Sequence, residues 1–357
     1  MADSLSLARD LIRISSPSGD ADGMRAVQQH VVDAIRSGAP DARVSAGGEE
    51  QPWTLISLGP TGTPVPLIAC HTDTVPVGDP DRWTHDPLSG ASDGNALHGR
   101  GSVDMKGGLA AAACALVAAA RRGAGGHLLL TADEEIGSLG AQRADDAISD
   151  LDLSGIIIPE ATSLSVRCSH RGACWLRLIS HGTSAHGSAP ERGVNAVTRL
   201  AAAIGPALET APLRNDQLLG AETASVGTFH GGEATNIVPA QAVATLDQRT
   251  IGDSAALRRH WQGVEGIDEV RTILDLSALR TDPDATFVRE LPADLDPAPV
   301  SYFTDGSVLQ ALAPGVPVVV WGPGDPTQMH SADEHLEIAQ LHDATRAFEQ
   351  ALVPDAE

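Results

Sequence analysis

Aromatic residues are scarce in this chain of 357 residues, where they make up 3% of the sequence. A surface that stacks on nucleic-acid bases or on sugar rings needs such side chains, so the scarcity argues against both kinds of binding. Lysine is almost absent as well, with Lys106 as the one example, and the formal net charge is -23. A chain this acidic repels polyanions, so we expect neither nucleic acid nor an anionic membrane as a partner.

Cysteine is also rare, and no two cysteines stand in a Cys-x-x-Cys pair: the four are Cys70, Cys114, Cys168 and Cys174. In a chain this poor in cysteine we expect reduced and mostly buried thiols, which favours a cytoplasmic location. Residues 1–20 carry charges inside their apolar stretch, so we expect no secretory signal there. Uninterrupted apolar runs fall short of the roughly 20 residues that a membrane helix needs, so no membrane span is expected.

The length of the chain predicts two domains rather than one. In the first half, amphipathic helical patterns alternate with short apolar runs, and the last part of the chain returns to this alternation. The expected helices are 6–14, 24–35, 107–120 and 337–352, and the expected strands are 65–70, 128–132, 155–158 and 316–321. Strands that are apolar throughout and separated by helices predict a doubly wound α/β domain with a mostly parallel sheet.

The pattern changes near Ser169. Strand, helix, two strands, helix and strand then follow one another at 173–180, 193–204, 224–230, 242–249, 254–264 and 270–276. This β-α-β-β-α-β order is typical of a ferredoxin-like α+β sandwich. We therefore predict a catalytic domain made of residues 1–169 and 282–357, with a smaller domain of residues 170–281 inserted into it.

Five side chains of the metal-binding type stand near the ends of predicted strands: His71, Asp104, Glu135, Glu160 and His330. Parallel strands bring their carboxyl ends to one edge of a sheet, where open α/β sheets place their sites. Two imidazoles and three carboxylates can hold two ions, with one imidazole and one carboxylate for each ion and one carboxylate to bridge them. The set therefore predicts a two-metal hydrolase centre.

Each of these segments also has a plainer interpretation when it is taken singly. Asp104 stands where a helix N-cap is expected, and the run of acids that ends at Glu135 is typical of a solvated strand end. Lys106 either tunes the charge near the metals or is simply an exposed lysine of a first helical turn. Five ligand-type residues at strand ends are hard to explain by chance, and together they favour the metal site. Glu134, which stands next to one of them and is not itself a predicted ligand, is available as a general base.

These segments resemble those of a known family, the M20 metallopeptidases, which include acetylornithine deacetylase, succinyl-diaminopimelate desuccinylase, aminoacylase-1 and carboxypeptidase G2. The matching segments are HTDTVPVG from His71, GRGSVDMKGG up to Gly108, TADEEIGSLG from Thr131, PEAT from Pro159 and GPGDPTQMHSADEHLEI up to Ile338. Their order and spacing make the resemblance specific, and it extends over residues 5–352, essentially the whole chain.

The resemblance implies the same five metal ligands, with Asp104 bridging two Zn²⁺ ions, for which Co²⁺ or Mn²⁺ are possible substitutes. It also implies that Asp73 orients His71 and that Glu134 is the general base. By spacing alone, Asp73 lies on the same face of its strand as His71 and can take the N–H of the ring nitrogen that is turned away from the metal. In the family a cis peptide tends to follow the bridging aspartate, which corresponds to the bond between Asp104 and Met105.

The inserted domain resembles the family's lid and dimerisation domain. The segment that ends at His186 matches a lid motif whose histidine reaches from one subunit into the partner's site and stabilises the oxyanion, so a homodimer through this domain is implied. Asn236 and Arg249 match positions that hold the carboxylate of the substrate. A guanidinium suits that group because it can bind both oxygens at once.

Substrate choice in the family varies with a loop that corresponds to Thr304 and Asp305. Acetylornithine deacetylases tend to have Thr-Glu-Ala there and desuccinylases Thr-Ser-Asp-Gly, whereas this chain has Thr-Asp-Gly. Both residues are therefore candidate substrate contacts. On one interpretation Asp305 meets an amino group of the substrate, and on the other it only forms a turn.

Three functions stay open at this point. The first is a metal-dependent hydrolase that removes the acyl group from a small N-acyl amino acid, of the acetylornithine deacetylase or succinyl-diaminopimelate desuccinylase type. The second is a carboxypeptidase or dipeptidase of the same family. The third is a catalytically silent binding protein with this fold, although the complete ligand set and the intact Glu134 argue against it.

Overall fold

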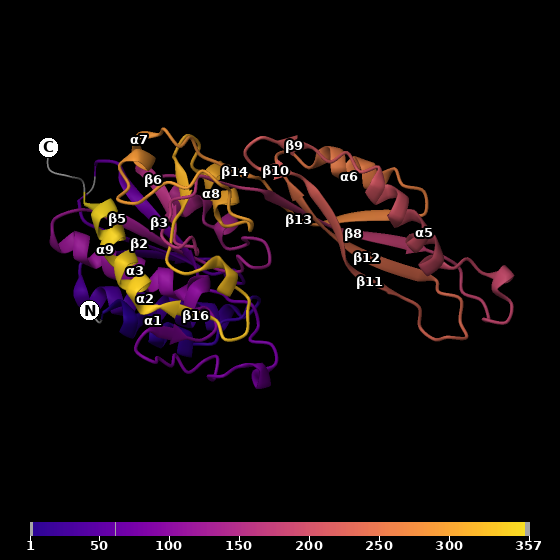
Figure 1. The fold of residues 1–357 in the computed structure, drawn as a ribbon, viewed down its shortest axis with the longest axis horizontal. Coiled ribbons are helices and arrows are strands. Elements are labelled where there is room, and N and C mark those ends of the chain that lie inside the picture. Colours follow the sequence, from indigo (N-terminus) through magenta and orange to yellow (C-terminus); the bar gives the residue numbers. More distant parts are fainter. Residues whose placement is uncertain (1–2, 61, 354–357) are drawn as a thin grey trace. The chain divides into compact units, whose positions relative to one another are not determined.

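In the computed structural model, which describes residues 3–60 and 62–353, the chain forms two compact units. Unit 1 is made of residues 1–169, 279–300 and 304–357, and unit 2 of residues 170–278 and 301–303. The two units differ in secondary structure, as the change of pattern near Ser169 predicts (Figure 1).

Unit 1 is built on a six-stranded sheet in the order β1-β2-β5-β3-β6-β15. The strands are β1 (Arg43–Gly47), β2 (Trp53–Leu58), β3 (Val65–His71), β5 (Gly126–Thr131), β6 (Leu153–Ile158) and β15 (Val318–Val320). β5, β3, β6 and β15 run parallel, whereas β2 is antiparallel to both of its neighbours, β5 and β1. The mostly parallel α/β sheet is thus confirmed, and β1 and β2 extend it beyond the strands that the apolar runs predicted.

The helices of unit 1 pack on one another and on this sheet. They are α1 (Ser4–Arg13), α2 (Ala21–Gly38), α3 (Gly107–Arg121), α4 (Asp145–Ile148), α7 (Thr286–Arg289), α8 (Gly306–Leu312) and α9 (Ile338–Leu352). The small side chains of α3 let it pack closely against α1, α9 and the sheet. Residues 102–121 are long and apolar enough to cross a membrane, but 83% of the window is buried inside the structure. The core of unit 1 accounts for that composition.

Shorter elements complete unit 1. β4 (Ala96–His98) pairs with β16 (His335–Glu337) as an antiparallel ladder. Single helical turns occur at 80–82, 141–143 and 326–328, and residues 102–106 form an irregular turn with a kink at Asp104 and Met105. β7 (Ser169–His170) and β14 (Leu279–Arg280) stand where the chain passes from one unit to the other.

Unit 2 has the predicted ferredoxin-like order. Its elements are β8 (Gly172–His181), a turn at 190–192, α5 (Ala196–Glu209), β9 (Asn215–Asp216), β10 (Gly220–Ala221), β11 (Thr223–Gly231), β12 (Gln241–Thr250), α6 (Ala255–Gln262) and β13 (Glu269–Leu276). The four long strands form an antiparallel sheet in the order β11-β12-β8-β13, and the short β9 and β10 pair separately. The prediction of an α+β sandwich is confirmed.

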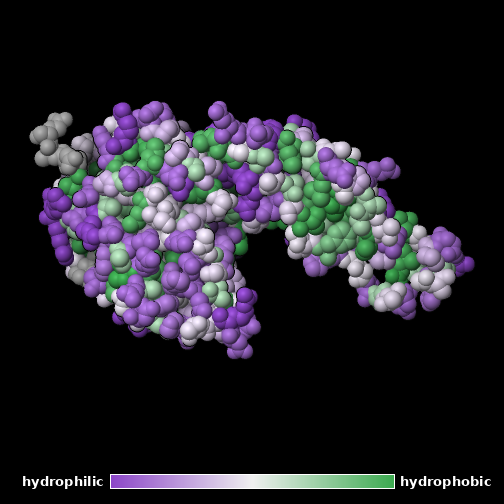
Figure 2. All heavy atoms as spheres, in the orientation of Figure 1, coloured by the Kyte–Doolittle hydropathy of each residue, from purple (hydrophilic) through white to green (hydrophobic). Residues whose placement is uncertain are grey.

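Alternation along the strands explains the core of unit 2. On β8, Leu176 and Leu178 are fully buried while Arg177 between them is exposed, as the period of two in a strand requires. Leu200 of α5 and Trp261 of α6 pack into the same cluster. Burial of a Leu side chain contributes about 1.5–3 kcal/mol, so unit 2 has a hydrophobic core of its own. Figure 2 also shows hydrophobic residues gathered on the visible surface of unit 2.

Candidate metal centre

Four parallel strands of unit 1 end at the same edge of the sheet. β3 ends at His71 and β5 at Thr131, and these two residues are partners in the register of the strands. β6 ends at Ile158, the partner of Val320 at the end of β15. Because the chain leaves each strand at this edge, the residues that follow neighbouring strands are brought together there.

Asp104 lies between two imidazoles. Its Oδ1 is 3.0 Å from Nε2 of His71, and its Oδ2 is 3.1 Å from Nε2 of His330. Oε1 of Glu160 lies 3.2 Å from the same nitrogen of His71, and Oε2 of Glu135 lies 2.9 Å from that of His330. Each imidazole thus faces one carboxylate of its own and shares Asp104, which is the arrangement expected of two metal positions with a bridging carboxylate.

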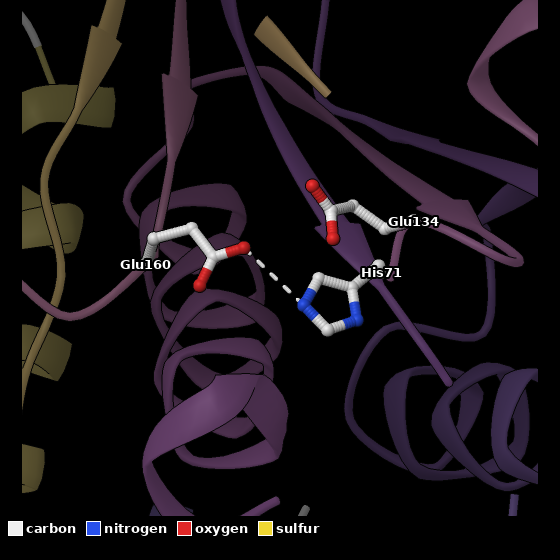
Figure 3. Close-up of side chains that lie close together, drawn as sticks. All are labelled: His71, Glu134 and Glu160. Carbon is white, nitrogen blue, oxygen red and sulfur yellow. Dashed lines mark ion pairs between the residues drawn. The ribbon is translucent and has the colours of Figure 1, made fainter. Parts of the chain in front are cut away.

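Glu134 stands beside this cluster. Donor atoms of His71, Glu134 and Glu160 lie within 4.8 Å of one another, and Asp104 forms a second such group with Glu135 and the other imidazole. Figure 3 shows the carboxylates of Glu134 and Glu160 turned toward the ring of His71 from different sides. The structure therefore brings all five predicted ligands and the predicted base into one place.

The two imidazoles differ in exposure. The side chain of His71 is 1% exposed, whereas that of His330 is 50% exposed. His330 comes from the loop after β15, and its φ of 61° lies in the left-handed region. The centre is buried at His71 and reaches solvent at His330.

Asp73 is fully buried and connects three segments. Its carbonyl oxygen lies 3.1 Å from Nδ1 of His71, closer than its carboxylate Oδ1 at 3.5 Å. The carboxylate accepts hydrogen bonds from the N–H groups of Glu134 and Glu135 and from the hydroxyl of Ser18. Asp73 therefore contacts the ring of His71 most closely through its main chain, and it holds the two neighbouring glutamates through its side chain.

Close packing fixes the segment before Glu160. A Cβ atom added at Gly108, in the first turn of α3, would lie 2.3 Å from the carbonyl oxygen of Pro159. A Cβ atom at Gly322, in the loop after β15, would lie 2.3 Å from the same oxygen. Only glycine permits both approaches, so α3 and this loop hold Pro159, and with it Glu160, from two directions.

The turn before α3 carries Asp104. The peptide bond between Asp104 and Met105 is cis, as the family resemblance implies. Lys106 is 1% exposed, and its Nζ donates a hydrogen bond of 2.8 Å to the carbonyl oxygen of Ile14. The interpretation of Lys106 as an exposed lysine is therefore wrong, because α1 covers it. Burial lowers the pKa of Lys106 to about 7.

Crowding of acids raises the pKa of most carboxyl groups at the centre. Burial and the charge of Asp104 raise the pKa of Glu160 to about 8. Burial and repulsion from Glu160 raise the pKa of Glu134 well above its ordinary value, and burial and the charge of Asp104 raise that of Glu135. Asp104 is the exception: burial opposes its ionisation, but hydrogen bonds with the two imidazoles lower its pKa.

The imidazoles bind protons strongly as well. Burial alone would lower the pKa of His71, but the charge of Glu160 and a hydrogen bond with Asp104 raise it well above the ordinary value. Hydrogen bonds with Asp104 and Glu135 raise the pKa of His330 to about 10. A metal ligand must be deprotonated, so a pair of cations would take the place of these protons.

Three carboxylate oxygens at the centre are buried and have no hydrogen-bond partner among the described residues: Oε1 of Glu134, Oε1 of Glu135 and Oε2 of Glu160. A buried acceptor without a partner costs about 1–3 kcal/mol, and a cation at the centre would satisfy such oxygens. Imidazole and carboxylate groups are ligands that Zn²⁺ takes in catalytic sites. The residues present therefore fit a pair of metal ions.

A comparison with known protein families agrees with this geometry. The model of the peptidase family M20/M25/M40 matches residues 67–353, a range that contains the whole metal cluster. The chain belongs to this family. Membership implies a dinuclear metal site, for which the cluster supplies candidate ligands, and the M20 chain is therefore a metallohydrolase that acts on amide or peptide bonds.

Two relatives match this M20 chain over most of its length. It is 31% identical over 378 residues to a succinyl-diaminopimelate desuccinylase of Methylobacterium sp. (strain 4-46), and the alignment covers 98% of this chain and 95% of that protein. It is 32% identical over 296 residues to an acetylornithine deacetylase of Klebsiella pneumoniae (strain 342), with 76% and 75% covered. A solved M20 family metallo-carboxypeptidase from Sulfolobus solfataricus shares the fold, with a TM-score of 0.82, 19% identity and 99% of both chains covered.

Three predicted site residues of the M20 chain belong to unit 2. His186 and Asn236 lie close together, because the N–H group of Gly187 donates a hydrogen bond of 2.7 Å to the carbonyl oxygen of Asn236. Both of these residues are exposed. Arg249 lies on β12 as the partner of Ala173 on β8, and it is only partly exposed. Unit 2 thus brings His186 and Asn236 together, and Arg249 stands apart from them.

Thr304 and Asp305 belong to unit 1 and are buried, with exposed fractions of 0% and 2%. Oδ2 of Asp305 accepts a hydrogen bond of 2.6 Å from the hydroxyl of Thr131 at the end of β5. The hydroxyl of Thr304 accepts one from the N–H of Gly306. Asp305 is therefore held beside the metal-binding edge of the sheet, and the contact of either residue with substrate stays a prediction.

Sequence reasoning missed residues that support the centre rather than form it. The carboxylate of Asp133 accepts a hydrogen bond of 2.7 Å from the N–H of Gly19. Glu334 is fully buried, and its carboxylate accepts a hydrogen bond from the N–H of Asp104. Glu334 was visible in the sequence as an acid four residues after His330. Its partners are backbone groups of a distant loop, however, and no sequence pattern displays those.

Proposed function

We propose that this M20 protein is a di-zinc amidohydrolase that removes the acyl group from a small N-acyl amino acid, of the acetylornithine or succinyl-diaminopimelate type. The observation that carries the proposal is the position of Asp104, with one oxygen at each imidazole, next to Glu134. The relatives that are 31% and 32% identical are a desuccinylase and a deacetylase. This supports an N-acyl amino acid as the class of substrate.

In this proposal His71 and Glu160 hold one ion, His330 and Glu135 hold the other, and Asp104 bridges them. When bound, the two ions supply a water of lowered pKa and polarise the scissile carbonyl group. Zn²⁺ is proposed because imidazole and carboxylate are among its usual ligands, and Co²⁺ or Mn²⁺ are substitutes that accept the same ligand types.

Glu134 is proposed as the general base. Its Oε1 is buried and has no hydrogen-bond partner among the residues that the structure describes, so one oxygen is ready to accept a proton. Burial and the neighbouring carboxylates raise the pKa of Glu134 well above its ordinary value. A base with a raised pKa takes a proton from water more readily near neutral pH. The same carboxyl group then delivers that proton to the departing nitrogen.

Arg249 is proposed to bind the carboxylate of the substrate. Its guanidinium pairs with Asp247 at 3.0 Å and lies 5.7 Å from the centre of the Phe303 ring. These contacts restrict the orientation of the planar group, which favours a contact with both oxygens of a carboxylate. Asn236 is the second proposed contact of that carboxylate, and because it lies beside His186 rather than beside Arg249, a second copy of the chain would have to supply it.

The geometry of unit 2 separates Arg249 from His186. Arg249 is the partner of Ala173 near the start of β8, whereas His186 follows His181 at the end of that strand. A strand rises about 3.3 Å per residue, so the ends of β8 lie about 30 Å apart. A small N-acyl amino acid cannot reach both residues in one chain. We therefore propose that a second copy of the chain supplies His186 to the site, where it stabilises the oxyanion.

The surface of unit 2 supports such a homodimer. Most of the large hydrophobic side chains that are exposed belong to this unit: Val194, Leu213, Leu218, Val226, Phe229, Ile237 and Ile273. Exposed apolar patches mark interaction surfaces. Val226 and Phe229 belong to β11, a strand at the edge of its sheet, and an edge strand can pair with another copy of the chain.

A mixing experiment tests the shared site. His186→Ala and Glu134→Gln proteins are each expected to be nearly inactive. After subunit exchange, a mixed dimer has one site with Glu134 from one chain and His186 from the other, so activity should return. The proposed sharing is wrong if verified exchange restores nothing, or if light scattering finds a fully active monomer.

A substrate panel tests the reaction itself. Amine release by the metal-loaded protein is followed with ninhydrin on N-acyl amino acids and on dipeptides. Release from acyl amino acids alone supports the proposal. Release from dipeptides would favour a carboxypeptidase or dipeptidase, the second candidate, for which the fold shared with the Sulfolobus carboxypeptidase is the supporting observation. Silence on the whole panel would favour a binding protein.

A further inference from the structure

Glu334 is a buried carboxylate with four hydrogen-bond donors. Its Oε2 accepts hydrogen bonds from Nη1 of Arg100 at 2.7 Å and from the N–H of Gly101 at 3.0 Å. Its Oε1 accepts hydrogen bonds from the N–H groups of Val103 at 2.8 Å and Asp104 at 3.1 Å. The side chain is 0% exposed. Both oxygens are therefore occupied by the loop that carries Asp104.

In this loop, the N–H groups of Gly101, Val103 and Asp104 donate to Glu334, while that of Ser102 donates to the carbonyl oxygen of Gly99. Asp104 has φ −121° and ψ 90°, outside the helical region, and Gly101 has a positive φ of 82°. Successive N–H groups in such a turn point into one concave space and form a site for an anion. A buried N–H group left without a partner is destabilising, because it has lost its hydrogen bonds to water and gained none. The carboxylate of Glu334, from another part of the chain, accepts the hydrogen bonds of these N–H groups.

Arg100 balances the charge of Glu334. The side chain of Arg100 is 5% exposed, and its guanidinium lies 5.1 Å from the centre of the Trp83 ring. A buried carboxylate is tolerated when a guanidinium and several N–H groups surround it, whereas either charge alone would be strongly destabilising. Both oxygens of Glu334 are thus occupied within the protein, which leaves neither of them for a metal ion.

Glu334 also joins the two segments that meet at the metal centre. His330 stands four residues before it, and Nε2 of His330 lies 3.1 Å from Oδ2 of Asp104. The carbonyl oxygen of Glu334 accepts a hydrogen bond of 3.0 Å from the N–H of Gly99, at the start of the same loop. The segment with His330 is therefore fixed to the loop with Asp104 just outside the cluster of ligands.

We propose that Glu334 is a positioning residue of the metal centre, which sets the carboxylate of Asp104 between the two imidazoles without touching a metal. The inference rests on the proposed two-metal site and adds a residue to it. Glu334 binds the main chain of Asp104, and the side chain of Asp104 reaches His71 and His330. A shift of the loop therefore moves both carboxylate oxygens of Asp104, so Glu334, which is hydrogen-bonded to the ligand but does not bind the metal, sets the position of Asp104.

Glu334→Gln tests this with almost the same side-chain shape. The amide keeps one acceptor oxygen, and its NH₂ group faces two donors, so two of the four contacts are lost. Arg100 also loses its counter-charge. We expect the affinity for Zn²⁺ to fall by about 10–100-fold, the range seen when a residue behind the ligands is lost. We also expect kcat to fall more than KM rises, because no substrate contact is removed.

Unit 2 offers a matched control in Glu222, which is 2% exposed. The carboxylate of Glu222 accepts hydrogen bonds from the guanidinium and the N–H of Arg214 and from the N–H of Ile251. Glu222→Gln therefore removes the same kind of buried contact in the unit that holds no metal ligand. We expect it to lower Tm in a similar way and to leave the affinity for Zn²⁺ unchanged.

The measurement uses the metal-stripped full-length protein. Titration with Zn²⁺ against a chromophoric chelator gives the stoichiometry and the Kd, and the visible absorption of bound Co²⁺ reports the arrangement of its ligands. Circular dichroism verifies that each variant is folded. If Glu334→Gln is not recovered as folded protein, Glu334→Asp takes its place. That variant keeps the charge but is too short to reach all four donors, and a loss of about tenfold in affinity is expected.

A lower affinity and an altered Co²⁺ spectrum for the Glu334 variant, with wild-type values for Glu222→Gln, support the inference. Wild-type affinity and spectrum for the Glu334 variant overturn it. An equal loss for Glu222→Gln also overturns it, because the effect would then come from general instability. If the wild-type protein itself does not take up two ions, the proposed function fails, and that failure is distinct from the first two.

Discussion

Replacement of Glu134 by glutamine tests the proposed chemistry most directly. The amide has nearly the same shape as the carboxylate but cannot accept a proton from water. A positioned general base contributes about 10²–10⁴-fold to the rate, which corresponds to about 3–5 kcal/mol of activation free energy. We expect kcat to fall by that factor and KM to change little, because Glu134 has no proposed role in holding the substrate.

The same substitution has a second, independent consequence in the metal-free protein. Burial and the charges of Glu160, Asp305 and Glu135 raise the pKa of Glu134 well above its ordinary value. A carboxyl group whose pKa is raised in the folded state destabilises the fold at pH values above its unfolded pKa of about 4.3. Glutamine removes that cost, so metal-free Glu134→Gln should unfold at a higher temperature than metal-free wild type at pH 8.

The assay combines initial rates on an N-acyl amino acid with metal analysis of the same sample. Glu160→Gln is the matched control, because Glu160 is proposed to hold a metal ion and its variant should lose metal as well as rate. A Glu134→Gln protein with two ions and a kcat near that of wild type would refute the assignment. Loss of metal together with rate would make Glu134 a ligand instead of a base.

Three further predictions follow from the charges and contacts of the structure. Binding of Zn²⁺ at pH 7 should release protons, because the pKa of Glu160 is raised to about 8 and that of His330 to about 10. Calorimetry in buffers of different ionisation enthalpy measures the number of protons released, and a value of zero would contradict the expectation. Arg249→Lys should raise KM for a substrate with a free carboxylate by about tenfold and change kcat little, because a lysine cannot bind both oxygens in the planar geometry. An unchanged KM in steady-state kinetics would count against the contact between Arg249 and the substrate carboxylate. Burial lowers the pKa of His170 to about 4, below the unfolded value of about 6.5, so wild type should lose roughly 3 kcal/mol of stability as the pH falls from the unfolded to the folded pKa. Urea unfolding of His170→Asn should lack this pH-dependent loss, and a free energy of unfolding that falls with pH as steeply as that of wild type would disprove the prediction.

Local patterns were enough to predict most of the fold. The apolar runs of β3, β5 and β6 and the helical spacing of α1 and α3 follow from the periods of strand and helix, which are properties of a short stretch of chain. β1 escaped prediction for a physical reason, whereas the buried β2 carries a local strand signal that the prediction missed. β1 is an edge strand with mostly exposed residues and no apolar run, so its pairing with β2, rather than its composition, makes it a strand.

The candidate site, like the fold, could be predicted only in part. The types of residue that can hold metal were visible, since His71 and Glu160 each follow an apolar run that predicts a buried strand. The environment of Lys106 was not visible, because its burial depends on α1, which is distant in sequence and covers it. Glu334 was overlooked for a similar reason, as its partners are N–H groups of another loop.

The sequence by itself determined the class of each domain, the residue types of a two-metal centre and the family, because side-chain chemistry and local periodicity are carried by the chain. Only the tertiary structure decided that Asp104 presents one oxygen to each imidazole, that the carbonyl group of Asp73 lies closer to Nδ1 of His71 than its carboxylate does, and that Glu334 holds the loop that carries Asp104. Those contacts join distant segments through the register of parallel strands and through backbone N–H groups. Both depend on where the strands pair, which no short stretch of sequence specifies.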